Sequence, residues 1–233
     1  QDAKKAKMFA KLAREITVSA KLGTTDPKQN PRLRSAIINA RSENMPNDRI
    51  SKAIQKAESS DNDKNYEEIR YEGYAIGGVA LIIDALTDNR NRTASEVRAI
   101  LNKYGGSLAE TGSVAYNFER IGIIEYKNNN INNDLLFDTA VEAGAIDLIN
   151  ENDKYKIICK PEELGKVRDF IAKQFNDPET VKLQWNANNT IKINEEHAKT
   201  LLKIIELLED NDDVQSIYSN FDISIDILEK ISL

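Results

Sequence analysis

The fold is set by residues 66–118, which read YEEIRYEGYAIGGVALIIDALTDNRNRTASEVRAILNKYGGSLAETGSVAYNF. Within this stretch, Gly77 and Gly78 form a turn ahead of the apolar run 79–83, whose length and composition are typical of a buried strand. A polar segment at 87–92 follows the apolar run and precedes a helical pattern. The sequence therefore predicts a strand, a polar loop and a helix in succession.

Local signals predict where this helix begins and ends. Thr93 and Glu96 have the spacing of a capping box, in which each side chain bonds the backbone N–H of the other, so the helix is expected to begin at Thr93. Gly105 and Gly106 predict its end near Tyr104, because glycine tolerates the left-handed backbone that follows many helices. Strands are predicted around it at 66–74, 79–86, 114–118 and 121–126.

Three short amphipathic helices are predicted before this stretch. Residues 3–21 place apolar side chains on one face and basic ones on the opposite face when they are plotted at 100° per residue. A second helix is expected from Pro31 with Asn30 as its N-cap, and a third after Pro46. Because the connections between them are short, the three helices are expected to form a small bundle.

Polar, asparagine-rich segments at 59–65, 127–134 and 186–189 predict boundaries between domains. After the second of these segments, strands and helices alternate in short pieces, which is typical of small α+β sandwiches and not of one large parallel sheet. Strands are expected at 146–149, 155–159, 181–185, 191–193 and 214–221, and helices at 135–143, from 161 onward and at 195–209.

Charge is distributed unevenly along the chain. The sequence carries a net −6, but residues 1–58 hold 13 lysines and arginines against 6 acidic residues, and the remainder has a net charge of −13. A basic first part predicts contact with a polyanion, whereas an acidic remainder opposes indiscriminate binding. A solvated, lysine-rich helix face is the alternative explanation of the same counts.

The basic side chains of the three helices are the candidate nucleic-acid contacts. They recur at helical spacing away from the apolar stripes, where lysine and arginine can reach phosphate groups. The candidates are Lys4, Lys7, Lys11, Arg14, Lys21, Arg34, Arg41, Arg49, Lys52 and Lys56.

A second candidate binding site is the polar loop after the central strand. Its residues lie where a strand meets a helix, a position that suits polar recognition, although the same side chains can also bond one another to hold the loop. The residues are Asp88, Asn89, Arg90, Asn91 and Arg92.

The sequence contains no recognisable catalytic or cofactor motif. The one histidine, His197, lacks partners at metal-ligand spacing beyond its neighbouring glutamates, and no histidine is placed to activate the one cysteine, Cys159. Neither GxGxxG nor GxxxxGK[ST] occurs. The acidic cluster at 206–213 matches no calcium-loop pattern and is expected to be a solvated loop. We therefore expect no enzyme activity, no cofactor and no metal.

Several motifs follow one another over nearly the whole chain. They are NPRLR at 30–34, NMP at 44–46, YEEIRYEGYAIGG at 66–78, LTDNRNRT at 86–93, GG at 105–106, GSV at 112–114, LEDNDDV at 208–214 and NF at 220–221. Together they resemble the YebC family, whose mitochondrial relative is the translational activator of cytochrome oxidase subunit one.

The resemblance implies an α+β protein of three domains. These are a basic helical bundle at 1–60, a discontinuous α+β domain at 66–128 and 187–233, and an α+β domain at 129–186 inserted in it, the last two ferredoxin-like. The resemblance also implies a non-enzymatic regulator. Bacterial members are described as DNA-binding transcriptional regulators, whereas the mitochondrial relative and other members act in translation, as ribosome-associated factors that help synthesis past proline-rich stretches.

The residues leave three interpretations of function open. The first is a DNA-binding transcriptional regulator, and the second is an RNA-binding factor of the ribosome, which the absence of a recognisable DNA-reading motif favours. The third is an acidic protein-interaction module, which would explain the net charge of −13 after residue 58 without nucleic acid. In each case we expect a cytoplasmic protein without a membrane span, because no run of about 18 apolar residues occurs and Cys159 has no cysteine to pair with.

Overall fold

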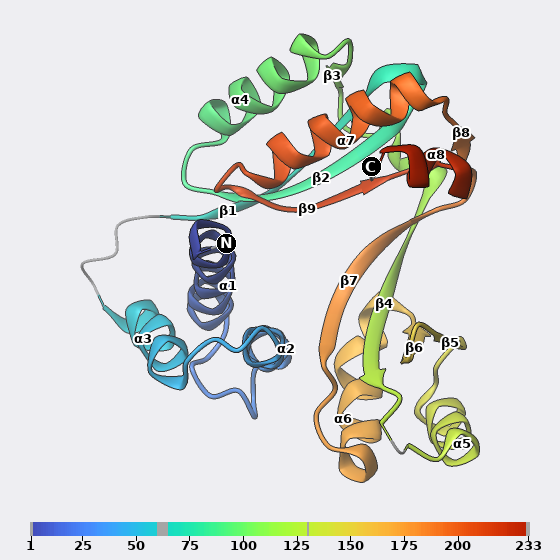
Figure 1. The fold of residues 1–233 in the computed structure, drawn as a ribbon. Coiled ribbons are helices and arrows are strands. Elements are labelled where there is room, and N and C mark those ends of the chain that lie inside the picture. The colour runs from blue at the N-terminus through green and yellow to red at the C-terminus, as the bar shows by residue number, and fades with distance from the viewer. Residues whose placement is uncertain (1, 60–64, 130, 232–233) are drawn as a thin grey trace. The chain divides into compact units, whose positions relative to one another are not determined.

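The computed structural model describes residues 2–59, 65–129 and 131–231 (Figure 1). The chain divides into two compact units, each assembled from two segments that are distant in sequence. The first unit comprises residues 1–63 and 120–184, and the second comprises residues 64–119 and 185–233. Most of the predicted linker at 59–65 lies outside the described residues. The predicted fold class, α+β with N-terminal helices followed by antiparallel sheets, is confirmed.

The first unit begins with the three predicted helices, α1 (Asp2–Leu22), α2 (Pro31–Ser42) and α3 (Asn47–Glu58). Asn30 is the N-cap of α2, as expected, since its Oδ1 accepts from the backbone N–H of Leu33 at 3.1 Å. Its Nδ2 donates to the carbonyls of Ser19 and Thr24, both at 2.8 Å, so this one side chain also joins α2 to the end of α1. The shared core includes Phe9, Ile16, Leu33, Ile37 and Ile50.

The first unit also contains a four-stranded sheet, in the order β5-β6-β4-β7, with two helices packed on it. Its core includes Ile124, Leu136, Ile157, Val167 and Ile171. The 3-10 turn η3 (Pro161–Glu163) starts at Pro161 and leads into α6. The elements are β4 (Phe118–Lys127), α5 (Asn133–Ala143), β5 (Asp147–Glu151), β6 (Lys154–Cys159), α6 (Leu164–Phe175) and β7 (Thr180–Ala187).

The second unit is built on a four-stranded antiparallel sheet, in the order β3-β1-β2-β9. Its strands are β1 (Glu67–Tyr74), β2 (Ala80–Thr87), β3 (Ser107–Ala109) and β9 (Val214–Ser219), and a short parallel pair joins β8 (Ile191–Lys192) to β10 (Phe221–Asp222). Its helical elements are η1 (Ile76–Gly78), α4 (Arg90–Lys103), η2 (Ala115–Asn117), α7 (Glu195–Glu209) and α8 (Ile225–Ile231).

Strand β2 is the centre of this unit because both of its faces are buried. Leu81 and Ile83 pack under α4 and α7, which lie together on one face of the sheet (Figure 1). Ala80 and Ile82 point to the opposite face, where they meet Val114. This alternation follows from the two-residue period of a strand, and it explains why the strand reads as a continuous apolar run.

Two predictions for the stretch 66–118 are wrong. Helix α4 begins at Arg90 and not at Thr93, because the side chain of Asn89 caps it by accepting from the backbone N–H of Arg92 at 3.1 Å. Residues 114–117 do not form a strand, since the backbone N–H groups of Val114 and Ala115 donate to a carboxylate and leave the chain in the turn η2; strand β4 begins only at Phe118. Strand β3 was not predicted.

Candidate nucleic-acid interface

Helix α1 carries half of the predicted cationic contacts, on the side away from its buried face. Lys4, Lys7 and Lys21 are exposed, whereas Lys11 and Arg14 are partly buried. On its opposite side the apolar residues Phe9, Ile16 and Ala20 are buried in the bundle core, as the helical plot of residues 3–21 predicts. The exposed cations of α1 therefore lie near its two ends, and the two partly buried cations lie between them.

Helix α3 places three further predicted cations, Arg49, Lys52 and Lys56, in exposed positions. The guanidinium of Arg49 lies 5.5 Å from the centre of the Phe9 ring, and the ammonium of Lys5 lies 5.6 Å from the same ring. The aromatic ring thus attracts cations from both helices. Lys5 was not predicted as part of this surface, although its spacing of four residues from Phe9 was the signal that could have found it.

The α2 candidates Arg34 and Arg41 have different surroundings. Arg41 is exposed, but the guanidinium of Arg34 bridges Asp169 of α6 and Asp177, at 3.1 Å to each. Beside it, Arg168 of α6 is fully buried and donates to the carbonyl of Pro31 at 2.8 Å. Arg34 therefore takes part in holding α2 against the sheet part of its unit.

A paired amide contact strengthens this attachment of α2. The side chain of Asn39 donates to the carbonyl of Val181 at 2.7 Å and accepts from its backbone N–H at 2.8 Å. The amide thereby satisfies both groups of one residue on the edge strand β7, much as a neighbouring strand would. Ile38 adds a buried apolar contact to the same core.

The second candidate site, Asp88 to Arg92, holds the start of α4 in place through hydrogen bonds and ion pairs. Arg92 Nη2 lies 2.9 Å from Asp88 Oδ1 and 2.6 Å from Asp213 Oδ2. Both hydrogen bonds raise the pKa of Arg92 above its ordinary value, and the bond to Asp213 has the larger effect. The guanidinium is therefore always charged. Arg90 and Asn91 are exposed, and the carbonyl of Arg90 accepts from the hydroxyl of Tyr71 at 2.9 Å.

The prediction that residues 206–213 form a solvated loop is wrong for Asp213, which is buried. It is only 4% exposed, and the hydroxyls of Thr87 and Thr93 donate to its Oδ2 at 3.0 and 2.7 Å. The sequence missed this residue because its partners come from β2 and α4, far away along the chain. Within the described parts of the chain, no three His, Cys, Asp or Glu side chains gather as metal ligands.

Glu72 of β1 is a second buried carboxylate that sequence reasoning missed. It accepts from the backbone N–H groups of Gly112, Val114 and Ala115 at 2.9, 2.9 and 3.0 Å. Burial acts to raise its pKa, but the three N–H donors and the nearby Arg70 outweigh burial and lower the pKa below its ordinary value. The carboxylate thereby fixes the turn η2.

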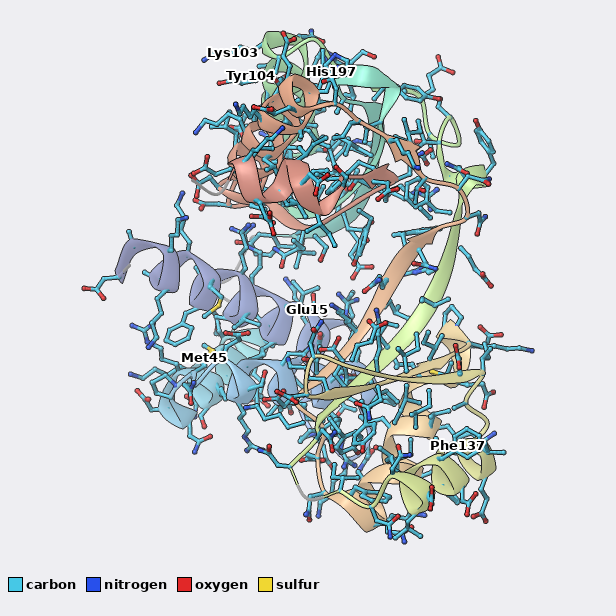
Figure 2. All side chains as sticks on the ribbon, turned by 45° about the vertical axis from the view of Figure 1, so that its right-hand side comes forward. Glu15, Met45, Lys103, Tyr104, Phe137 and His197 are labelled. Atoms are coloured by element: carbon cyan, nitrogen blue, oxygen red, sulfur yellow. The ribbon has the colours of Figure 1, made fainter. Side chains whose placement is uncertain are left out.

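The two residue types most often used in catalysis occupy structural positions. His197, labelled in Figure 2, lies against Gly77, which has a φ of 72°, and a Cβ added there would be 2.8 Å from His197 Nδ1. Glycine at this position provides both the left-handed turn and the space. Cys159 is buried, and burial together with Glu163 and Glu162 raises the pKa of its thiol to about 11. A neutral, buried thiol suits a core position.

Comparison with known proteins identifies the family. A model of the TACO1/YebC protein N-terminal domain matches residues 1–60, and a model of the TACO1/YebC second and third domain matches residues 66–221. The chain is also similar to a crystal structure of a conserved hypothetical protein from Aquifex aeolicus, with 42% sequence identity and a TM-score of 0.84, over 96% of this chain and 92% of that chain. Since the two family models span most of its length, the protein belongs to the TACO1/YebC family, a family of regulatory proteins.

Proposed function

We propose that the protein is a non-enzymatic, nucleic-acid-binding regulator of gene expression, and that α1 and α3 supply its phosphate contacts. The observation that carries this proposal is the exposure of Lys4, Lys7, Arg49, Lys52 and Lys56 on two helices of the segment with a net charge of +7. Exposed lysines and arginines attract phosphates and give affinity that depends on salt but little on sequence.

Duplex DNA is the first candidate target, and the exposed face of α3 supports it. Asn47, Ser51 and Gln55 recur every four residues along this face, all three exposed, next to the cations Lys52 and Lys56. Amide and hydroxyl side chains of this kind pair with base edges in the major groove. Only the four residues 43–46 separate α2 from α3, a spacing that suits a helix-turn-helix. These features favour a role in transcription.

Structured RNA, including that of the ribosome, is the second candidate, and Tyr116 favours it. This side chain is 80% exposed and lies on the turn η2, which Glu72 holds in place. Asn188 also donates its backbone N–H to the carbonyl of Asn117 at 2.8 Å, so the turn is fixed from a second side. An exposed aromatic ring on a fixed turn can stack on an unpaired base. This candidate corresponds to a role in translation.

The test is the salt dependence of binding to a DNA duplex and to an RNA hairpin of equal length. Replacement of Lys52 and Lys56 by glutamate is expected to weaken binding to any sequence, with a loss of about 0.9 in the log–log salt slope for each phosphate contact removed. The matched control is the same change at Lys192 and Lys230, two exposed lysines of the second unit. If both pairs of changes reduced the salt slope equally, the assignment of the phosphate contacts to α3 would be wrong.

Two further variants separate the candidate targets. Asn47→Ala with Gln55→Ala is expected to reduce the preference among DNA sequences by about 1–3 kcal/mol for each base that these side chains read, without changing the salt slope. Tyr116→Ala is expected to weaken RNA binding by about 1–3 kcal/mol if a base stacks there. An effect of the Asn47 and Gln55 changes alone would indicate DNA as the target, and an effect of Tyr116→Ala alone would indicate RNA.

The proposal places this function in the cytoplasm. The thiol of Cys159 is buried and has no second cysteine in the sequence, which suits a reducing compartment. Among the residues that the structure describes, no helix combines the length and the apolar character needed to cross a membrane.

A further inference from the structure

Helix α5 and the segment just after it present an unusual concentration of exposed apolar side chains. Among the described residues, nine large apolar side chains are exposed, and four of them lie within twelve residues of sequence. These four are Leu135, Phe137, Val141 and Ile146, with exposed fractions between 43 and 59%, and Phe137 is labelled in Figure 2. We call these four residues the α5 patch. Clusters of this kind are more informative than single exposed apolar residues, which are common.

The core of the protein does not account for the α5 patch. Leu136, Ala140 and Ala143 are buried and face the sheet, which satisfies the apolar requirement of an amphipathic helix. Phe137 and Val141 are four residues apart and lie on another side of α5, where they form one continuous stripe. Packing of the fold therefore leaves this stripe in contact with water.

The charged residues of helix α5 itself are all acidic. Between Lys127 and Lys154 the sequence has six acidic residues and no lysine, arginine or histidine. Asp134, Asp138 and Glu142 are exposed on α5 itself, next to the apolar stripe. The remaining acidic residues are Asp147, Glu151 and Asp153, all of them exposed.

We propose that the α5 patch is a docking site for a basic, amphipathic helical segment of another protein. The partner's apolar side chains would cover Phe137 and Val141, and its lysines or arginines would face Asp134, Asp138 and Glu142. Helix-in-groove recognition uses apolar anchors at this helical spacing, and complementary charge accelerates association and selects the partner.

The same charges argue against other occupants. Phosphate groups of nucleic acids and of anionic lipids would be repelled by the exposed side of α5, on which the helix contributes three negative charges and no positive charge. A symmetric contact between two copies of this chain would place the acidic residues of one copy against those of the other, which is unfavourable. A basic protein segment satisfies both the apolar and the charged part of the surface, and this assignment does not depend on the proposed nucleic-acid role.

The test uses the full-length chain and three synthetic peptides of about 18 residues. The first has leucines on one helical face and lysines elsewhere, the second has glutamate in place of lysine, and the third has the composition of the first without helical periodicity. The first peptide is expected to shift the amide NMR signals of residues 134–147, and the other two are not. Equal binding of the glutamate peptide, or shifts confined to other segments, would overturn the proposal.

Variants of the α5 patch test its two components separately. Phe137→Ser with Val141→Ser is expected to weaken binding of the first peptide by about tenfold or more, because central apolar anchors carry most of the affinity. Asp134→Asn, Asp138→Asn and Glu142→Gln together are expected to weaken binding by about tenfold at low salt and to remove most of its salt dependence. All these side chains are exposed, so the fold is expected to tolerate the changes.

A matched control and a measurement of mass complete the design. Ile225→Ser with Leu228→Ser changes two exposed apolar residues of α8, and binding of the first peptide is expected to change less than twofold. Sedimentation of the unmodified chain at increasing concentration tests for a second copy at the same surface. Self-association that Phe137→Ser with Val141→Ser abolishes would show that a second copy is the occupant and would overturn the assignment to a basic partner.

Discussion

Helix α3 and the first turn of α4 have similar residues but use them in opposite ways. Helix α3 begins with Asn-Asp-Arg at 47–49, and the α4 segment reads Asp-Asn-Arg-Asn-Arg at 88–92. On α3 the basic side chains are exposed, and the ion pair between Lys52 and Asp48 is loose at 3.9 Å. On α4, Arg92 lies 2.6 Å from the buried carboxylate of Asp213. The two segments have similar residues, but only Arg92 of α4 has a buried carboxylate as its partner. That partner gives Arg92 a structural role, whereas the exposed cations of α3 are able to bind a ligand.

The largest expected effect follows from removal of that buried partner. Asp213→Ala leaves the hydroxyls of Thr87 and Thr93 and the guanidinium of Arg92 without their common acceptor, and we expect a loss of about 3 kcal/mol in the free energy of unfolding. Urea denaturation followed by the fluorescence of Trp185, the single tryptophan, measures this loss in the second unit. Asp212→Ala, at the exposed neighbouring position, is expected to cost less than about 0.5 kcal/mol.

Glu72 gives the second largest expected effect, and its effect depends on pH. Glu72→Gln keeps an acceptor but loses the charge that three backbone N–H groups stabilise, so we expect a loss of about 2 kcal/mol near neutral pH. The pKa of Glu72 is lowered in the folded protein, so its contribution is complete above the ordinary carboxyl pKa and is lost as the pH falls through the lower folded pKa.

The corresponding measurement is urea denaturation of both proteins across the acidic range. The difference in unfolding free energy between the unmodified protein and Glu72→Gln should be constant above about pH 6 and should decrease as the pH falls below about 4. A difference that does not change with pH would mean that the carboxylate charge contributes nothing beyond the shape of the side chain.

Much of the fold followed from local sequence signals. Asn30 before Pro31 correctly marked the start of α2, and the apolar run at 79–83 correctly predicted the buried central strand. These features depend on residues within one turn of each other or on a strand with two covered faces. Local propensity and hydrophobic pattern are sufficient in such cases.

A partner far away in sequence contributes to both wrong predictions for the stretch 66–118, although the cap of α4, Asn89, is a local signal. Thr93 and Glu96 matched a capping box, but the hydroxyl of Thr93 bonds Asp213, 120 residues later, and Asn89 caps the helix. Residues 114–118 resembled a strand, but Glu72, more than 40 residues earlier, holds Val114 and Ala115 in a turn, and strand β4 begins only at Phe118. A distant partner also sets the surroundings of Arg34, which pairs with Asp177, 143 residues away. Periodicity and spacing contain no information about such contacts.

Asn89 tests the corrected start of α4 and gives a moderate effect. Asn89→Ala removes the acceptor for the backbone N–H of Arg92, and we expect a loss of about 1 kcal/mol in unfolding free energy. Glu96→Ala, which would matter equally if a capping box were present, is expected to cost less than about 0.5 kcal/mol, because its bond to Asn211 is exposed. A larger loss for Glu96→Ala than for Asn89→Ala would instead support a capping box formed by Thr93 and Glu96.

The smallest effect on stability is expected on α3, and there it distinguishes binding from folding. Lys52→Glu with Lys56→Glu changes two exposed side chains, and the pair of Lys52 with Asp48 is loose at 3.9 Å, so the unfolding free energy should change by less than about 0.5 kcal/mol. Thermal unfolding followed by circular dichroism of the helices measures this change. A large loss of stability would assign these lysines a role in the bundle, like that of Arg92 in α4. Unchanged stability together with a reduced salt slope of nucleic-acid binding is the combination that only an exposed phosphate contact produces.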